Sequence, residues 1–165
     1  MMTKPKLEIR PQQRYAAIRT AVPIPFGSYL GPLWKEVDQW LKHKGVTSTG
    51  SAMIRYLTTD MSKKLDIDVG FTIDQALPGD GRVITDVLPA GRYVTLHYTG
   101  PYKGKGVYKS NVALLEWGKA NNIAWSTSTK EGVEWWNGRV EFYLTDPERE
   151  KNTKKYQTEL AFLAK

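Results

Sequence analysis

A chain of 165 residues with a net charge of +7 and no cysteine has the size of one domain and cannot form a disulfide or a thiolate metal site. Hydrophobic residues make up 41% and charged residues 25% of the sequence, which is typical of a globular protein and excludes a disordered chain. With only two histidines and no cofactor motif, we expect neither a metal nor a cofactor. The apolar runs are too short to span a bilayer, and the N-terminus lacks the apolar core of a signal peptide. We therefore expect a soluble cytoplasmic protein.

The positive charge is spread along the chain. Lysine pairs such as Lys42/Lys44 and Lys103/Lys105 fall at expected turns and segment ends. Because no basic helix or zinc-finger spacing is present, we expect no direct DNA binding. Aromatic residues make up 12% of the chain, more than a core of this size needs, which favours aromatic side chains in a ligand site.

The first half of the chain indicates a strand, a helix and two further strands. The β-rich segment at 14–22 is followed by Pro and Gly residues, and apolar residues then recur at helical spacing from 30 to 41, with a stop at Gly45. Trp34 and Trp40 lie on this helix, and we expect their side chains to pack in the core between the helix and the sheet. Strands are expected at 51–58 and 65–73, and the second of these alternates strictly between apolar and other residues.

The second half repeats this order, with a strand at 92–99, a helix at 107–121 and strands within 133–145 and at 156–163. Four segments of the two halves match in the same order: 14–22 with 92–100, 30–46 with 107–123, 56–60 with 143–147, and 68–71 with 159–162. We therefore expect one domain over 1–165, with repeat halves at about 7–76 and 82–163. The predicted class is α+β: two βαββ units related by pseudo-two-fold symmetry form an antiparallel sheet of about eight strands, with both helices on one face.

The strand around Glu141 carries the residues that we expect to bind a ligand. If Val140 and Phe142 pack under a helix, Glu141 and Tyr143 point to the opposite, open face of the sheet. Strand alternation and the repeat add further residues to this face: Tyr15, Tyr56, Tyr93, His97, Glu159, and one of Trp135 and Trp136. Aromatic rings around a carboxylate suit an organic cation or a flat, electron-poor molecule.

Two alternatives stand beside this interpretation. Tyrosine and glutamate are also common cross-strand partners on a half-exposed sheet, where Glu141 could pair with Arg139. The open face could instead be covered by a second copy of the chain in a homodimer.

Three segments, LPAGRYVTLHYTGPYKG (88–104), VEFYLTDP (140–147) and TELAFL (158–163), resemble the GyrI-like small-molecule-binding family over about 6–163. This family includes the effector-binding domains of multidrug-responsive transcription activators and the DNA gyrase inhibitory protein. The resemblance implies a ligand groove between the two halves, where a buried glutamate and aromatic residues bind lipophilic cations. Glu141 matches that glutamate, with Tyr143 and Tyr156 as aromatic neighbours. The sequence departs from many relatives at Tyr98, where they carry histidine, and no helix-turn-helix precedes the fold, so we expect a stand-alone binding protein.

The resemblance also leaves the function open between three classes. The first is binding and sequestration of a lipophilic cationic or flat aromatic compound. The second is hydrolysis, because some stand-alone members are similar to hydrolases that open electrophilic cyclopropane rings of DNA-alkylating natural products. Glu141 or Glu159 would then be the general base, and Tyr102, Tyr143, Trp135 and Trp136 would form the walls. The third is binding of a protein partner such as DNA gyrase.

Overall fold

An eight-stranded antiparallel sheet and two α-helices make up most of the chain in a computed structural model, which describes residues 1–46, 50–60 and 62–165. The strands of the sheet are β1 (Lys6–Arg10), β2 (Gln13–Val22), β3 (Ala52–Tyr56), β4 (Leu65–Thr72), β5 (Ile84–Leu88), β6 (Gly91–Thr99), β9 (Arg139–Tyr143) and β10 (Gln157–Leu163). The helices are α1 (Gly27–His43) and α2 (Gly106–Ala120). A separate hairpin joins β7 (Thr127–Lys130) to β8 (Val133–Trp136), and a short 3-10 helix, η1 (Thr153–Lys155), precedes β10.

Helix α1 forms where the sequence predicts it, because its apolar residues recur along one face. Val37 and Leu41 on this face are fully buried against the sheet. Lys42 and His43 lie in the last turn, where positive charge favours the negative end of the helix dipole. Gly45, at φ +80°, then adopts the left-handed conformation that commonly follows a helix end. No helix of the described residues is long and apolar enough to cross a membrane.

The strand order β1-β6-β10-β9-β3-β4-β2-β5 is symmetric about its middle. The central pair is β9 with β3, and β10, β6 and β1 on one side correspond to β4, β2 and β5 on the other. This confirms the predicted α+β fold of duplicated units with pseudo-two-fold symmetry. The sequence did not predict β1 or β5, each of which pairs with a strand of the other half: β1 with β6, and β5 with β2.

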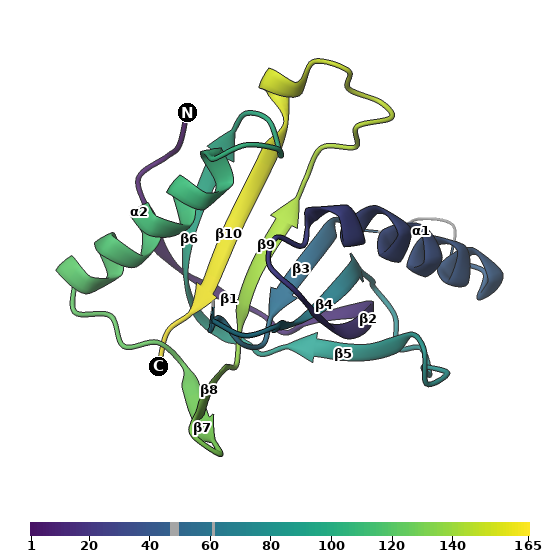
Figure 1. Ribbon diagram of the computed structural model, residues 1–165, viewed down its shortest axis with the longest axis horizontal. Helices are drawn as coiled ribbons and strands as arrows, with labels where there is room; N and C mark the ends of the chain where they lie inside the picture. Colours follow the sequence, from purple (N-terminus) through teal and green to yellow (C-terminus); the bar gives the residue numbers. More distant parts are fainter. Residues whose placement is uncertain (47–49, 61) are drawn as a thin grey trace.

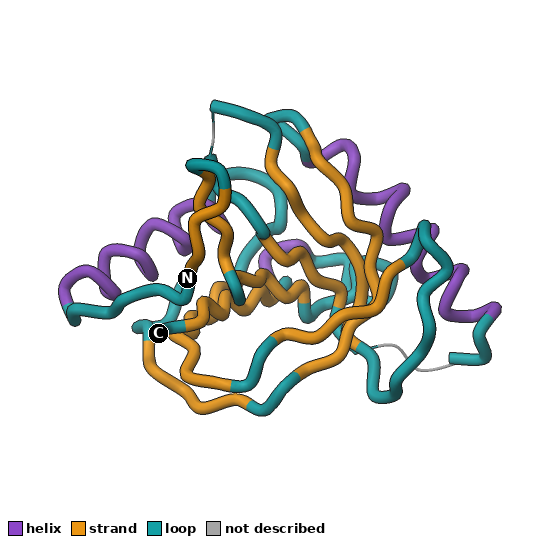
Figure 2. Tube along the Cα trace, turned by 90° about the horizontal axis from the view of Figure 1, so that it is seen from below, coloured by secondary structure: helices purple, strands orange, loops and turns teal. Residues whose placement is uncertain are grey.

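The sheet curls into a half-barrel (Figure 2). Five strands separate β1 from β2 in the sheet, yet only Pro11 and Gln12 connect them in the chain. A link of this length spans at most about 11 Å, whereas six strand spacings in a flat sheet measure about 29 Å. Pro89 and Ala90 make the same short connection between β5 and β6. The exchanged edge strands therefore require the curl.

Both helices cover the same face of the sheet, as predicted, but they lie apart (Figure 1). Helix α1 packs on β2 and β4, and helix α2 packs on β6 and β10. The central strands β9 and β3 run between them. Side chains on the helix side of these two strands are therefore positioned between α1 and α2.

The opposite, helix-free face is also buried, which corrects one expectation. Val140 and Phe142 were expected under a helix, but they belong to a buried cluster on the helix-free face, together with Tyr15, Met53, Tyr93 and Leu163. Because the curled sheet encloses this face, it needs apolar residues as much as the helix side does. The helix side of β9 carries Arg139, Glu141 and Tyr143 instead.

Candidate functional site

Glu141 lies in the central strand pair of the sheet, next to the pseudo-two-fold axis. It pairs with Ile54 across β9 and β3, and the repeat equates these two residues, so the pair maps onto itself. On the neighbouring strand β10, Glu141 is in register with Leu160, which packs under α2. Glu141 is only 4% exposed and points toward the helices, not toward the helix-free face as the sequence interpretation had it.

Three neutral groups hold the carboxylate of Glu141. The hydroxyl of Tyr56 donates to Oε1 at 3.1 Å, and the hydroxyl of Tyr143 donates a short hydrogen bond to the same oxygen. Asn111 of α2 donates from Nδ2 to Oε2 at 3.0 Å and also to the backbone oxygen of Val107. The two tyrosines are equivalent in the repeat, so the two halves of the fold each contribute one donor to a single carboxylate.

The two tyrosines remain donors over a wide pH range. Burial raises the pKa of both Tyr56 and Tyr143 well above the ordinary value, and the nearby charge of Glu141 adds to the effect. Both phenols are therefore neutral near pH 7 and can keep their hydrogen bonds to the carboxylate.

Glu141 differs from the other carboxylates of the sheet in its partners. Asp68 is fully buried and forms an ion pair with Arg19 at 2.8 Å, and the partly buried Glu159 forms one with Arg10 at 2.6 Å. Among the described residues, Glu141 forms no ion pair. Burying a carboxylate that no direct ion pair neutralises carries a large desolvation cost, which a fold retains most readily where the charge has a function.

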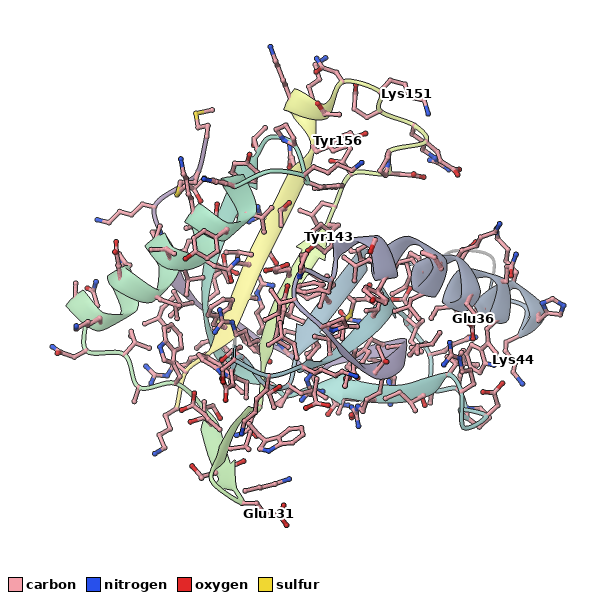
Figure 3. All side chains as sticks on the ribbon, viewed as in Figure 1. Glu36, Lys44, Glu131, Tyr143, Lys151 and Tyr156 are labelled. Carbon is pink, nitrogen blue, oxygen red and sulfur yellow. The ribbon has the colours of Figure 1, made fainter. Side chains whose placement is uncertain are left out.

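Aromatic rings from both halves of the fold pack on Tyr143, one of the donors to this carboxylate. Trp34 of α1 meets Tyr143 edge-on, with ring centroids 5.4 Å apart, and Tyr102 meets the same ring at 5.1 Å. Tyr102 also packs on Tyr156, at 4.6 Å. Figure 3 shows Tyr143 between the helices and Tyr156 just before the start of β10. Tyr143, Trp34 and Tyr102 are only partly buried, so this wall lies at the surface between the helices.

Arg139 lies beside Glu141 on the same side of β9. Its guanidinium stacks on Phe162, 4.3 Å from the ring centroid, and on Trp136, 4.7 Å away. Nη2 donates to Oδ1 of Asn111 at 3.3 Å. The side-chain amide of Asn111 thus bridges the positive and the negative group of the site.

Of the predicted site residues, the structure brings together Glu141, Tyr143, Tyr56, Tyr102 and Tyr156, with Trp136 beside them under Arg139. Three others lie elsewhere. Tyr93 and Glu159 are on the helix-free face, where Tyr93 lines a cavity of about 140 Å³ next to Phe142. Trp135 lies on the β7–β8 hairpin, with the amine of Lys130 over its ring.

The sequence interpretation missed Trp34, Asn111 and Arg139 as site residues. Trp34 was expected only in the helix core. The repeat contains a signal for two of them, because the alignment of 30–46 with 107–123 places Trp34 on Asn111, so both occupy the same position on their helices. Arg139 was assigned to the same face as Glu141, but the wrong choice of face separated it from the helix that carries Asn111.

The fold is similar to that of several solved structures. The EcmrR chain in a complex with DNA matches with a TM-score of 0.78 and 19% identity over 99% of this chain, and this chain spans 57% of that longer chain. The EcmrR C-terminal domain alone matches with a TM-score of 0.73 and 20% identity, covering 98% of this chain and 96% of that domain.

Two further structures share the fold at lower similarity. SAV2435 bound to tetraphenylphosphonium matches with a TM-score of 0.61 and 12% identity, over 99% of this chain and 94% of that one. A hydrolase from Listeria innocua has a TM-score of 0.62 and 12% identity, over 98% and 92% of the two chains.

No curated protein sequence matches the chain. A family model, however, matches residues 3–165, which is nearly the whole sequence. The chain belongs to the family of GyrI-like small molecule binding domains.

Proposed function

We propose that this protein binds lipophilic cationic or flat aromatic compounds between α1 and α2, and that Glu141 receives a positively charged or hydrogen-bond-donating group of the ligand. Binding would sequester such compounds. The observation that carries this proposal is a buried carboxylate that has three hydrogen-bond donors and an aromatic wall, but no ion pair among the described residues.

The contacts of the site suggest how a ligand would enter. Trp34, Tyr102 and Tyr143 meet edge-on above the carboxylate, so a flat ligand has to separate these rings. A ring face in contact with a desolvated cation contributes about 2 kcal/mol, which offsets the lost contacts between the rings. The similar fold of SAV2435, which binds the lipophilic cation tetraphenylphosphonium, supports this ligand class.

Hydrolysis is the second candidate, and the similar fold of the Listeria innocua hydrolase favours it. A general base needs a lone pair directed at the water that it deprotonates. Oε1 of Glu141 already accepts two hydrogen bonds and Oε2 accepts one, so the lone pair available to a water or to a ligand donor is on Oε2. Binding needs only this acceptor, whereas hydrolysis also needs a water placed between it and the substrate, and we therefore place binding first.

Calorimetric titration with tetraphenylphosphonium tests the proposal. Glu141→Gln keeps the size of the side chain and removes its charge, and we expect it to weaken binding at least about tenfold, the loss of one charge-assisted contact. Glu159→Gln is the matched control: it removes a carboxylate from the helix-free face, and we expect less than a twofold change. Equal effects of the two substitutions would contradict the proposal. If the wild type hydrolyses a spirocyclopropane substrate and Glu141→Gln abolishes this turnover, the hydrolase function would be favoured.

A further inference from the structure

Asn111 links the guanidinium of Arg139 to the carboxylate of Glu141. Arg139 and Glu141 are separated by one position on β9 and point to the same side, so their Cα atoms lie about 7 Å apart. The rings of Phe162 and Trp136, which meet each other edge-on, both pack against the guanidinium. Burial lowers the pKa of Arg139, while the charge of Glu141 acts in the opposite direction.

Arg139 has far fewer hydrogen-bond acceptors than its five N–H groups could use. Within the described part of the chain, its one side-chain hydrogen bond runs from Nη2 to Oδ1 of Asn111 at 3.3 Å, and Nε is buried without a partner. By contrast, Arg10 and Arg19 each donate to two carboxylates. The aromatic rings packed on the Arg139 guanidinium offer its N–H groups no strong acceptor, so the N–H groups along its edge remain for an acceptor of the ligand.

We propose that Arg139 is the second polar anchor of the ligand site and that the preferred ligand is a zwitterion. This ligand is a flat aromatic compound whose positive group meets Glu141 and whose carboxylate, or a similar acceptor, meets the edge of Arg139. The inference rests on the proposed function and adds the class of ligand.

Two physical arguments connect the orphaned guanidinium to this ligand class. A planar guanidinium edge matches a carboxylate through two parallel N–H bonds, which are among the stronger hydrogen bonds in proteins. A ligand with only a positive charge would meet Arg139 as a like charge close by, in a site where aromatic side chains reduce screening by water. The same Arg139 therefore favours a zwitterion and disfavours a simple cation.

A matched pair of xanthene dyes tests the inference, because the free acid is a zwitterion and its ethyl ester is a cation with the same ring system. We expect wild-type protein to bind the acid about tenfold more tightly than the ester in a fluorescence anisotropy titration, a difference of about 1.4 kcal/mol. Arg139→Leu should abolish or reverse this preference. Arg149→Leu removes an exposed arginine, whose side chain is 90% accessible, and should leave the preference unchanged.

The outcomes separate this inference from the proposed function. Tighter binding of the ester by the wild type would overturn the zwitterion proposal and leave the proposed function intact. If the wild type binds neither dye nor tetraphenylphosphonium, the proposed function itself fails. If Arg139→Leu does not fold, Arg139→Lys takes its place: it keeps the charge but not the planar edge, and we expect the preference for the acid to fall about threefold or more. An unchanged preference would contradict the role of the guanidinium.

Discussion

The substitutions Glu141→Gln and Asp68→Asn distinguish a carboxylate kept for function from one kept for stability. Both residues are buried, with exposed fractions of 4% and 0%. Asp68 accepts two hydrogen bonds from Arg19 and one from Tyr15, so Asp68→Asn breaks a direct ion pair. Glu141→Gln removes a charge whose hydrogen-bond donors are all neutral side chains.

The expected magnitudes follow from these contacts. In Glu141→Gln, the two tyrosines donate to a neutral amide oxygen instead of a carboxylate, which costs about 1 kcal/mol for each hydrogen bond. Asn111 then faces an amide nitrogen and loses its acceptor, which costs about 1 kcal/mol more. Neutralising the carboxylate removes a desolvation penalty of similar size or larger. We expect Glu141→Gln to change the free energy of unfolding by no more than about 1 kcal/mol. Asp68→Asn should lower it by about 3 kcal/mol, a value reduced because Arg19 is partly exposed.

Urea unfolding of the wild type and both variants, followed by tryptophan fluorescence and circular dichroism, measures these differences from midpoints at constant m-value. The reasoning would be refuted if Glu141→Gln lost as much stability as Asp68→Asn. Glu141 would then be a structural group, and the argument that its buried charge is retained for ligand binding would lose its basis.

Two further predictions concern the tyrosines and the close packing of the sheet. The pKa values of Tyr56 and Tyr143 are raised in the folded protein, so their contribution to stability is complete below the unfolded value of about 10 and is lost as the pH rises above it. Phenolate absorbance of the folded protein at pH 11 should therefore fall at least two tyrosines short of the nine that ionise in guanidinium chloride, and a full count would contradict this. A Cβ at Gly70 would lie 1.8 Å from the backbone oxygen of Ala16, so Gly70→Ala should destabilise the fold by about 2 kcal/mol or more in thermal unfolding. Gly27→Ala, whose Cβ meets nothing within 4 Å, is its control, and equal stability of the two variants would show that the sheet can yield at Gly70.

The elements of each half could be predicted because their signals are local. The helical spacing that contains Val37 and Leu41, and the alternation in β4, depend only on neighbouring residues. The repeat then supplied the symmetry, and with it the equivalence of Tyr56 and Tyr143. The short strands β1 and β5 gave no comparable signal, since each is stabilised by pairing with the other half of the chain.

The direction of Glu141 could not be derived from alternation alone. Alternation shows that Val140 and Phe142 share one side of β9 and that Glu141 lies on the other, but it does not show which side faces the helices. The usual rule assigns the apolar side to the helices, and here the curl of the sheet buries the apolar side instead. The register of Glu141 with Leu160, which requires the three-dimensional pairing, resolves the choice.

A crystal structure of the protein with tetraphenylphosphonium tests the central claim most directly. We expect the cation between α1 and α2, in contact with Trp34 and Tyr143, its phosphorus nearer to the Glu141 carboxylate than to any other acidic group, and the Tyr102–Tyr143 ring contact opened. A ligand bound instead on the helix-free face, in the cavity next to Tyr93, would contradict the assignment of Glu141 as the centre of the binding site.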